Sequence, residues 1–332
     1  MSLKIIRPGL MTTLQDAGRY GYQKMGIITS GAMDMYSLRM ANILVGNDEY
    51  EAALEITLRG PTIEFTSDTL IAITGGDLCP VLDGQKVQTL RPVAVKAGAI
   101  LKFTSCKVGA RAYLAVAGGY DVPEVMGSKS TYLRAGIGGF YGRALQKGDL
   151  LSTNEPSEYG QQMMINLLSR GAHSYAHAKW YISKVHTSKE NLRKPIRVMA
   201  GLQYDEFCEK AKYDFCATDY LITTQSDRMG YRLSGAKLEL NHPLEMISEV
   251  ASLGTIQVPP DGNPIILMAD HQTTAGYPVI GQVATVDVAR IAQLKPGDRI
   301  YFKLISNEEA ERLYIEMEKC ISNLKIAVAG KL

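Results

Sequence analysis

The 332-residue sequence has no long hydrophobic run, no paired-cysteine motif and no strong charge of either sign. No apolar stretch approaches the roughly 20 residues that cross a bilayer, and residues 1–9 contain no long apolar core. We therefore expect neither a membrane-spanning segment nor a signal peptide. The formal net charge is +2, so bulk charge favours neither nucleic acid nor an anionic membrane as a partner.

The cysteines also argue against a disulfide framework. They are scattered and odd in number, and none forms a Cys-x-x-Cys pair (Cys79, Cys106, Cys208, Cys216 and Cys320). This usage is typical of reduced thiols, so we expect a cytoplasmic protein.

Familiar catalytic motifs are absent as well. The sequence contains no His-Glu-x-x-His, no Gly-x-Ser-x-Gly and no Walker loop, so we expect no metal site and no serine nucleophile elbow. The glycine-rich residues 75–77 and 136–139 fit tight β turns better than a phosphate loop.

What the sequence does contain is a series of short apolar segments rich in Val, Ile, Thr, Phe and Tyr, separated by Gly, Pro and Asp. Segments of this length and composition are typical of strands. They predict a mainly β fold of barrels or sandwiches. The segments are residues 69–74, 93–95, 100–103, 111–116, 255–258, 265–269, 279–286 and 299–304.

Two local signatures recur in the same order in both halves of the chain. Residues 58–65 resemble residues 233–240, and residues 96–103 resemble residues 295–302. The repetition predicts two similar β domains, which we place at residues 1–151 and 196–305.

Residues 152–195 between these domains are polar and hold three of the five histidines (His173, His177 and His186). We interpret this stretch as a linker with a short exposed helix, although a catalytic use of the histidines stays open.

Two further helices can be predicted from their caps. Asp34 can cap a helix over residues 35–45 that ends at Gly46. On its apolar face lies Asn42, either as a buried hydrogen bonder or as a pocket residue. Ser306 and Glu309 form a capping box that starts a C-terminal helix over residues 306–325. This helix either packs on the second domain or docks a partner.

The densest polar cluster follows an apolar run at residues 264–269. Asp270, His271 and three further hydrogen-bonding side chains stand in a row before a turn marked by Gly276 and Pro278. Since buried polar groups need partners, the cluster is either a binding site where two core strands meet or a polar hairpin tip. His271, as a lone histidine, favours a turn residue over a ligand or base.

Two other polar groups have the same ambiguity. Thr13, Gln15, Asp16 and Arg19 could hold a small polar substrate, or they could satisfy the backbone of an elaborate turn. Arg228 could clamp a carboxylate or phosphate, with a surface salt bridge as the alternative.

Together these segments resemble a known family over most of residues 3–302. It is the allophanate hydrolase subunit 2 family, also called the biotin-dependent carboxyltransferase-like family or the family of the 5-oxoprolinase C subunit (KipA). The segments that carry the resemblance are residues 9–21, 30–47, 54–60, 113–123, 127–131, 138–149, 228–235, 254–260 and 268–278.

The resemblance implies two cyclophilin-like β-barrel domains, here followed by the C-terminal helix. It also implies a subunit of an ATP-dependent 5-oxoprolinase, which opens 5-oxoproline to glutamate together with a KipI-like subunit and a LamB/YcsF-like subunit. One alternative is a regulatory protein that antagonises a KipI-type inhibitor of a histidine kinase. Another is a carboxyltransferase component, although this chain has no biotinylated Met-Lys-Met type segment.

By the same resemblance, the catalytic candidates are Asp270, Asn42 and Arg228. Asp270 would orient or deprotonate the substrate, Asn42 and Gln272 would bind its amide or carboxylate, and Arg228 would hold developing negative charge. The other substrate-binding candidates are Thr13, Gln15, Asp16, Arg19, Thr273, Thr274 and Tyr277.

Three positions depart from the usual motifs of this family. Leu202 replaces the proline of Gly-Pro-Gln, Val250 replaces the glycine of Ser-Glu-Gly, and Ala275 replaces a glycine of Thr-Thr-Gly-Gly-Tyr-Pro. If position 275 requires a positive φ, the alanine would be strained and the loop would differ.

Overall fold

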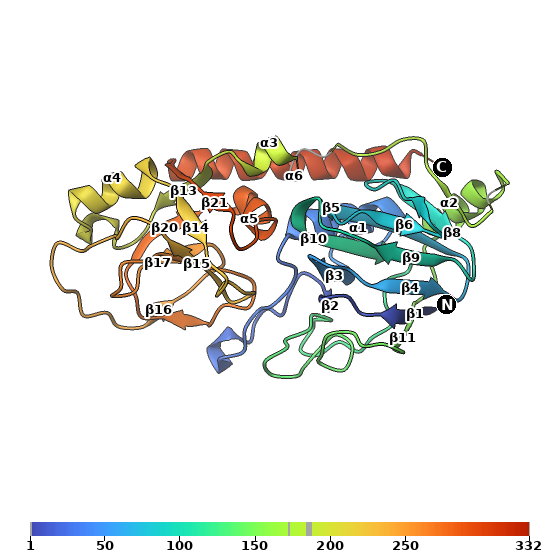
Figure 1. Ribbon diagram of the computed structural model, residues 1–332, viewed down its shortest axis with the longest axis horizontal. Coiled ribbons are helices and arrows are strands. Elements are labelled where there is room, and N and C mark those ends of the chain that lie inside the picture. The colour runs from blue at the N-terminus through green and yellow to red at the C-terminus, as the bar shows by residue number, and fades with distance from the viewer. Residues whose placement is uncertain (1, 172, 184–187, 332) are drawn as a thin grey trace. The chain divides into compact units, whose positions relative to one another are not determined.

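The structure is a computed structural model that describes residues 2–171, 173–183 and 188–331 (Figure 1). The chain divides into two compact units. Unit 1 comprises Met1–Arg19, Asp34–Ser188 and Ile321–Leu332, and unit 2 comprises Tyr20–Met33 and Lys189–Cys320.

Unit 1 is built on two antiparallel sheets of six strands each within the described residues. In spatial order, the first sheet is β11 (Leu150–Ser152), β1 (Ser2–Arg7), β4 (Thr62–Phe65), β9 (Ile100–Phe103), β6 (Pro80–Leu82) and β7 (Gln85–Lys86). The second is β12 (Tyr175–His177), β8 (Pro92–Val95), β5 (Thr69–Asp77), β10 (Val108–Val116), β3 (Ala53–Thr57) and β2 (Met11–Gln15).

The core of unit 1 lies between these two sheets. In β4 and β9 every second residue is buried, so each strand presents one apolar face. Those faces join residues of β3, β5, β8 and β10 in one apolar cluster. The strands β5 and β10 are buried almost throughout because the helix α1 (Met35–Val45) packs on both of them, as Figure 1 shows.

The predicted caps of α1 are confirmed. The Asp34 carboxylate accepts hydrogen bonds from the Ser37 amide at 2.8 Å and from the Ser37 hydroxyl at 2.7 Å. Gly46 ends the helix with a left-handed φ of 76°, the conformation that glycine adopts most readily.

Unit 2 contains one sheet that comes close to a closed barrel. Its order is β21 (Arg299–Ile300), β14 (Tyr220–Ile222), β15 (Gly230–Ser234), β18 (Ile265–Leu267), β17 (Thr255–Gln257), β20 (Val279–Val283), β13 (Ile196–Ala200) and β22 (Phe302–Leu304). The strands β21 and β22 stand at opposite ends of this order, yet one residue separates them in the chain. A single segment therefore pairs with both ends of the sheet.

The remaining elements of unit 2 surround this sheet. The strands β16 (Glu249–Val250) and β19 (Thr274–Ala275) form a separate two-stranded ribbon. The helices are η1 (Gln23–Met25), α3 (Lys189–Leu192), η2 (Tyr204–Glu206), α4 (Glu209–Ala217) and α5 (Thr285–Ala292).

The C-terminal helix α6 spans Asn307–Ala329, longer than the predicted 306–325. The Ser306 hydroxyl accepts a hydrogen bond from the Glu309 amide at 3.2 Å, in agreement with the predicted cap. Leu313 and Met317 pack on an apolar cluster of unit 2, and Ile321 and Val328 are buried in the part of the helix that belongs to unit 1.

The units differ from the predicted domain limits in two places. Residues 20–33 belong to unit 2, although the first domain was predicted to span residues 1–151. Of the predicted linker, residues 152–188 belong to unit 1. There the helix α2 (Glu158–Leu168) buries Met163 and Leu167 and packs on β5 and β8, so it is not an exposed linker helix.

Two of the linker histidines, His173 and His177, line one hollow of about 350 Å³ in unit 1. His186 lies outside the described residues.

The fold class itself is confirmed: the chain is mainly β, with a barrel sheet and a C-terminal helix. One of the repeated signatures also has the same local structure in both units. Gly98 and Gly297 both have positive φ, and each donates its amide to a neighbouring strand residue, Phe65 and Ile222 respectively.

Candidate functional site

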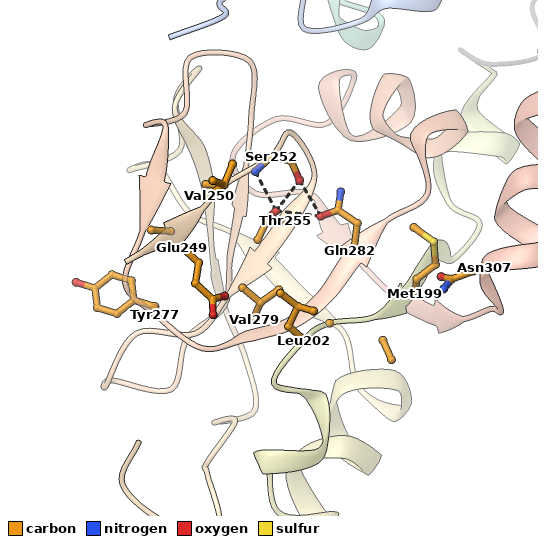
Figure 2. A pocket seen from close by; sticks show the side chains of 14 residues that line it. Met199, Leu202, Glu249, Val250, Ser252, Thr255, Tyr277, Val279, Gln282 and Asn307 are labelled. Carbon is orange, nitrogen blue, oxygen red and sulfur yellow. Dashed lines mark hydrogen bonds between the residues drawn. The ribbon is translucent and has the colours of Figure 1, made fainter. Parts of the chain in front are cut away.

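The candidate site is a pocket of about 280 Å³ in unit 2, shown in Figure 2. It lies where the end of β13, the β16–β19 ribbon, β20 and the first residue of α6 meet. The lining residues are Met199, Ala200, Gly201, Leu202, Glu249, Val250, Ala251, Ser252, Thr255, Ala275, Tyr277, Val279, Gln282 and Asn307.

Close backbone packing shapes one wall of this pocket. A Cβ atom at Gly201 would lie 2.3 Å from the Val279 carbonyl oxygen, so position 201 accepts only glycine without a shift of the chain. The Gln203 side chain then accepts a hydrogen bond from the Val279 amide at 3.0 Å. These contacts hold the 201–203 turn against β20.

Another wall carries a compact polar group, drawn with dashed lines in Figure 2. The Thr255 hydroxyl donates to Gln282 Oε1 at 2.9 Å, and the Ser252 hydroxyl donates to the same oxygen at 3.3 Å. Gln282 Nε2 donates to the Leu253 carbonyl at 2.8 Å. The amide of Gln282 is therefore held in a fixed orientation, as a binding group requires.

The charge in the described lining of the pocket is of one sign, negative. Its lining contains one carboxylate, that of Glu249, and no lysine, arginine or histidine among the described residues. Gln203 Nε2 donates to Glu249 Oε2 at 3.5 Å, a long hydrogen bond. The pocket consequently suits neutral or cationic groups better than anions.

The predicted polar cluster reaches this pocket only at its end. Tyr277 lines the pocket, and so does its neighbour Ala275. Gln272 and Thr274 are exposed, and Thr273 uses its backbone carbonyl to accept a hydrogen bond from the Ala251 amide. The cluster thus forms the ribbon that carries one wall.

Asp270 and Arg228 form a buried ion pair. Arg228 Nε donates to Asp270 Oδ2 at 2.9 Å, and Arg228 Nη2 donates to Asp270 Oδ1 at 3.0 Å. Arg228 Nη2 also donates to the Gly31 carbonyl at 2.6 Å. This geometry favours a structural role for both residues, in which they tie the 20–33 segment to the rest of unit 2.

His271 follows this pair in the chain, and its burial lowers the pKa of the imidazole below the ordinary value of 6.5. The hydrogen bond to the Gln272 carbonyl and the negative charge of Asp270 would each raise this pKa, but burial has the larger effect. The imidazole is therefore neutral at pH 7. In agreement with a turn residue, its Nδ1 lies 2.7 Å from the carbonyl oxygen of Gln272.

Asn42 is completely buried in unit 1. Its Nδ2 donates to the Glu51 carbonyl at 2.6 Å, and its Oδ1 accepts a hydrogen bond from Asn47 at 3.1 Å. Of the two roles predicted for a polar residue on this helix face, the contacts favour the buried hydrogen bonder.

The polar residues near the N-terminus hold a loop of unit 1. The Asp16 carboxylate accepts hydrogen bonds from the Gly18 amide, the Ser128 hydroxyl and the Lys129 amide, at 2.8, 2.8 and 2.6 Å. Arg19, fully buried, donates to the carbonyls of residues 125 and 130. Of the two alternatives for these residues, the contacts favour the elaborate turn over a substrate site.

Thr13 and Gln15 belong to the same arrangement. Gln15 Nε2 donates to the Thr13 hydroxyl at 3.1 Å and to the Thr131 carbonyl at 3.1 Å. Both side chains are buried, so they help to hold the 125–131 loop.

All three departures from the family motifs line the candidate pocket. Leu202, Val250 and Ala275 come from different segments, and each contributes an apolar side chain to the same lining. None of them is among the residues with positive φ in the described chain. Ala275 is therefore unstrained, because β19 places it in an extended conformation.

The polar wall of the pocket, which consists of Ser252, Thr255 and Gln282, was not among the predicted site residues. Ser252, Thr255 and Gln282 are separated in sequence and carry no motif of their own. The feature that relates two of them is their position in the sheet. Thr255 and Gln282 lie directly opposite each other on the paired strands β17 and β20. That pairing could be recognised only after the strand order was known.

Neither a metal-binding cluster nor a membrane-spanning helix was expected from the sequence. Within residues 2–171, 173–183 and 188–331, no group of three or more His, Cys, Asp or Glu side chains could hold a metal ion. Over those same residues, no helix is both long enough and apolar enough to cross a membrane.

Comparison with known proteins places the chain among relatives of the same length. It is 39% identical to the 5-oxoprolinase C subunit of Haemophilus influenzae over 319 residues, which cover 96% of each chain. It is 39% identical to the 5-oxoprolinase C subunit of Escherichia coli over 322 residues, 97% of each chain.

A solved structure supports the same relationship. The urea amidolyase of K. lactis matches 97% of this chain with a TM-score of 0.85 and 33% identity, although the match covers 20% of that much longer protein. The family model described as carboxyltransferase domain, subdomain A and B, matches residues 25–304. On the fold, the length of the match and these identities, the chain belongs to the carboxyltransferase domain family.

Proposed function

We propose that this chain is the C subunit of an ATP-dependent 5-oxoprolinase, which cleaves 5-oxoproline to L-glutamate. The observation that carries the proposal is the end-to-end match to two proteins named as the C subunit of 5-oxoprolinase, which covers nearly the whole of both chains. As a subunit it would act with a KipI-like protein and a LamB/YcsF-like protein.

The pocket supplies some of the features that such a substrate requires. A lactam ring is small and mainly apolar, with one N–H donor and one carbonyl acceptor. The oriented Gln282 amide, with Ser252 and Thr255 beside it, can hydrogen-bond groups of that kind. The substrate carboxylate needs a cation, and the described lining contains none. We therefore expect a partner protein to supply that cation.

ATP is the second substrate of the proposed reaction, since an unstrained amide is opened only slowly by water. A triphosphate requires cationic side chains or a nest of backbone amides. The described pocket offers neither lysine nor arginine, and the N-terminus of α1 is occupied by the Asp34 cap. We accordingly expect the nucleotide site to be shared with the KipI-like sister subunit, at its interface with this chain.

The test is reconstitution from purified proteins. This chain, the KipI-like protein and the LamB/YcsF-like protein are combined with 5-oxoproline and ATP, and glutamate is measured. We expect glutamate only when all three chains and ATP are present. A complex of the three chains that assembles, as shown by size-exclusion chromatography, but forms no glutamate would contradict the enzyme and favour the regulatory protein.

A substitution in the polar wall tests whether the reaction takes place in this pocket. Gln282→Ala removes the second N–H of the oriented amide and the oxygen that positions the Ser252 and Thr255 hydroxyls, so we expect the rate of glutamate formation to fall at least about tenfold. The matched control is Gln161→Ala, which makes the same change at an exposed position of α2, outside the pocket lining and outside the predicted site residues, and should leave the rate unchanged.

The carboxyltransferase component is the second candidate, because the matching family model is described as a carboxyltransferase domain. It would need a biotin carboxylase and a biotinylated carrier from other chains. Transfer of labelled bicarbonate to an amide acceptor that depends on this chain would support it, and glutamate formation without any biotin would exclude that requirement.

A further inference from the structure

The loop over residues 241–250 exposes large apolar side chains to an unusual degree. Ile247 is 87% exposed and Val250 is 88% exposed, and Leu202, which lines the same pocket as Val250, is 83% exposed. Isolated exposed hydrophobic residues are ordinary, but Leu202 and Val250 line one pocket and Ile247 lies three residues from Val250 in the chain. Exposed apolar residues grouped in this way mark a surface that another molecule covers.

A second hollow adjoins this group. It measures about 490 Å³, and its mainly apolar lining includes Pro243, Leu244 and Met246 from the same loop. Tyr277 lines both this hollow and the candidate pocket. The two hollows and the loop therefore form one surface, which we call the 241–250 surface.

The backbone of this surface offers an open strand edge. In the described part of the chain, β16 pairs with β19 and with no further strand. An extended segment can add to such an edge through main-chain hydrogen bonds while its alternate side chains enter neighbouring pockets.

The charged side chains of this surface determine which kind of extended segment it favours. Glu245 and Glu249 are exposed on the loop, and the described lining of the candidate pocket contains no basic side chain. The lysine that lines the second hollow, Lys237, donates to the Asp261 carbonyl at 2.7 Å. Basic side chains are attracted to this surface and acidic ones are repelled.

We propose that the 241–250 surface binds an extended segment of another protein in which apolar and basic residues alternate. The apolar residues occupy the two hollows beside Tyr277, and a lysine or arginine meets Glu249. A small molecule confined to either hollow would leave Ile247 in water, because Ile247 lines neither of them. A peptide side chain in the candidate pocket would exclude 5-oxoproline from it, and the binding test below needs neither substrate nor partner chains, so its outcome is separate from that of the reconstitution.

The test uses the full chain and a blocked hexapeptide of alternating valine and lysine, with binding measured by isothermal titration calorimetry. Matched peptides carry glutamate or serine in place of lysine. We expect the lysine peptide to bind with a dissociation constant below about 1 mM, more tightly than the serine peptide, and the glutamate peptide not to bind. Affinity should fall as salt is raised.

Exposed substitutions then locate the site without risk to the fold. Glu249→Lys and Val250→Ser should each weaken binding of the lysine peptide about tenfold or more. Glu311→Lys and Ile326→Ser make similar changes at exposed positions of α6 and should have no effect. The proposal is overturned by absence of saturable binding, by equal binding of the lysine and glutamate peptides, or by equal effects at both pairs of positions.

Discussion

At the scale of single residues, the side-chain types in the sequence identified the polar candidates for the site. They did not show which groups those side chains bind in the folded protein. Asp270 and Arg228 were recognised as a carboxylate and a guanidinium in suggestive motifs. The structure pairs them with each other through two hydrogen bonds. Loss of activity in a variant of either residue would consequently report on folding as well as on catalysis.

We predict that Asp270→Asn lowers the free energy of unfolding by about 3–5 kcal/mol, because it removes the carboxylate charge to which two N–H groups of the buried Arg228 guanidinium donate. Urea denaturation at pH 7 measures the change. The double variant Asp270→Leu with Arg228→Met should recover most of the loss, since no charge then remains unpaired. A fully stable Asp270→Asn protein without activity would instead restore Asp270 as a catalytic residue.

At the scale of elements, the helix α5 is attached to β13 by a second ion pair, whose carboxylate is fully buried. Asp287 accepts hydrogen bonds from Arg197 Nη2 at 2.6 Å and from Arg197 Nε at 3.0 Å, and Arg290 lies 3.1 Å away. Burial alone would raise the pKa of Asp287. The hydrogen bonds and charges of Arg197 and Arg290 outweigh burial and lower it below its ordinary value of 3.8.

Because the pKa of Asp287 is lower in the folded state, its stabilising contribution is complete above the unfolded pKa and is lost as pH falls through the folded pKa. We predict that Asp287→Asn is less stable than the natural protein at pH 7, and that this difference shrinks steadily below about pH 4. Urea denaturation at a series of pH values measures it. Asp205→Asn, at a side chain that is 99% exposed, is the control and should show no difference at any pH.

At the scale of the whole molecule, the chain does not pass once from the first unit to the second. Residues 20–33 belong to unit 2, while the residues on both sides of them belong to unit 1. Two contacts fix this segment: Arg228 donates to the Gly31 carbonyl, and Met33 is buried in the core of unit 2.

We predict that Met33→Ala destabilises unit 2 by about 2–5 kcal/mol, as expected when a buried methionine is truncated. Hydrogen exchange should show reduced protection of the amides in β15 and β18, with those of β5 and β10 unchanged. Reduced protection confined to β5 and β10 would contradict the assignment of the 20–33 segment.

Much of this organisation could be predicted from local patterns. The β class and the helix caps at Asp34 and Ser306 depend on residues that are near one another in the chain. The family could be recognised for the same reason, since its motifs are contiguous. The limits of the units could not be predicted in this way, because the 20–33 segment is held by contacts that are remote in sequence.

The local chemistry of the chain thus determined its β class, its helix caps at Asp34 and Ser306 and its family. Tertiary packing decided which polar residues are structural and which face a pocket. Arg228 and Gly31 are 197 residues apart, and Leu202, Val250 and Ala275 meet only because β13, β16 and β19 converge. Contacts of this kind depend on how distant segments fold together, and such long-range pairing leaves no trace in the local pattern of a single sequence.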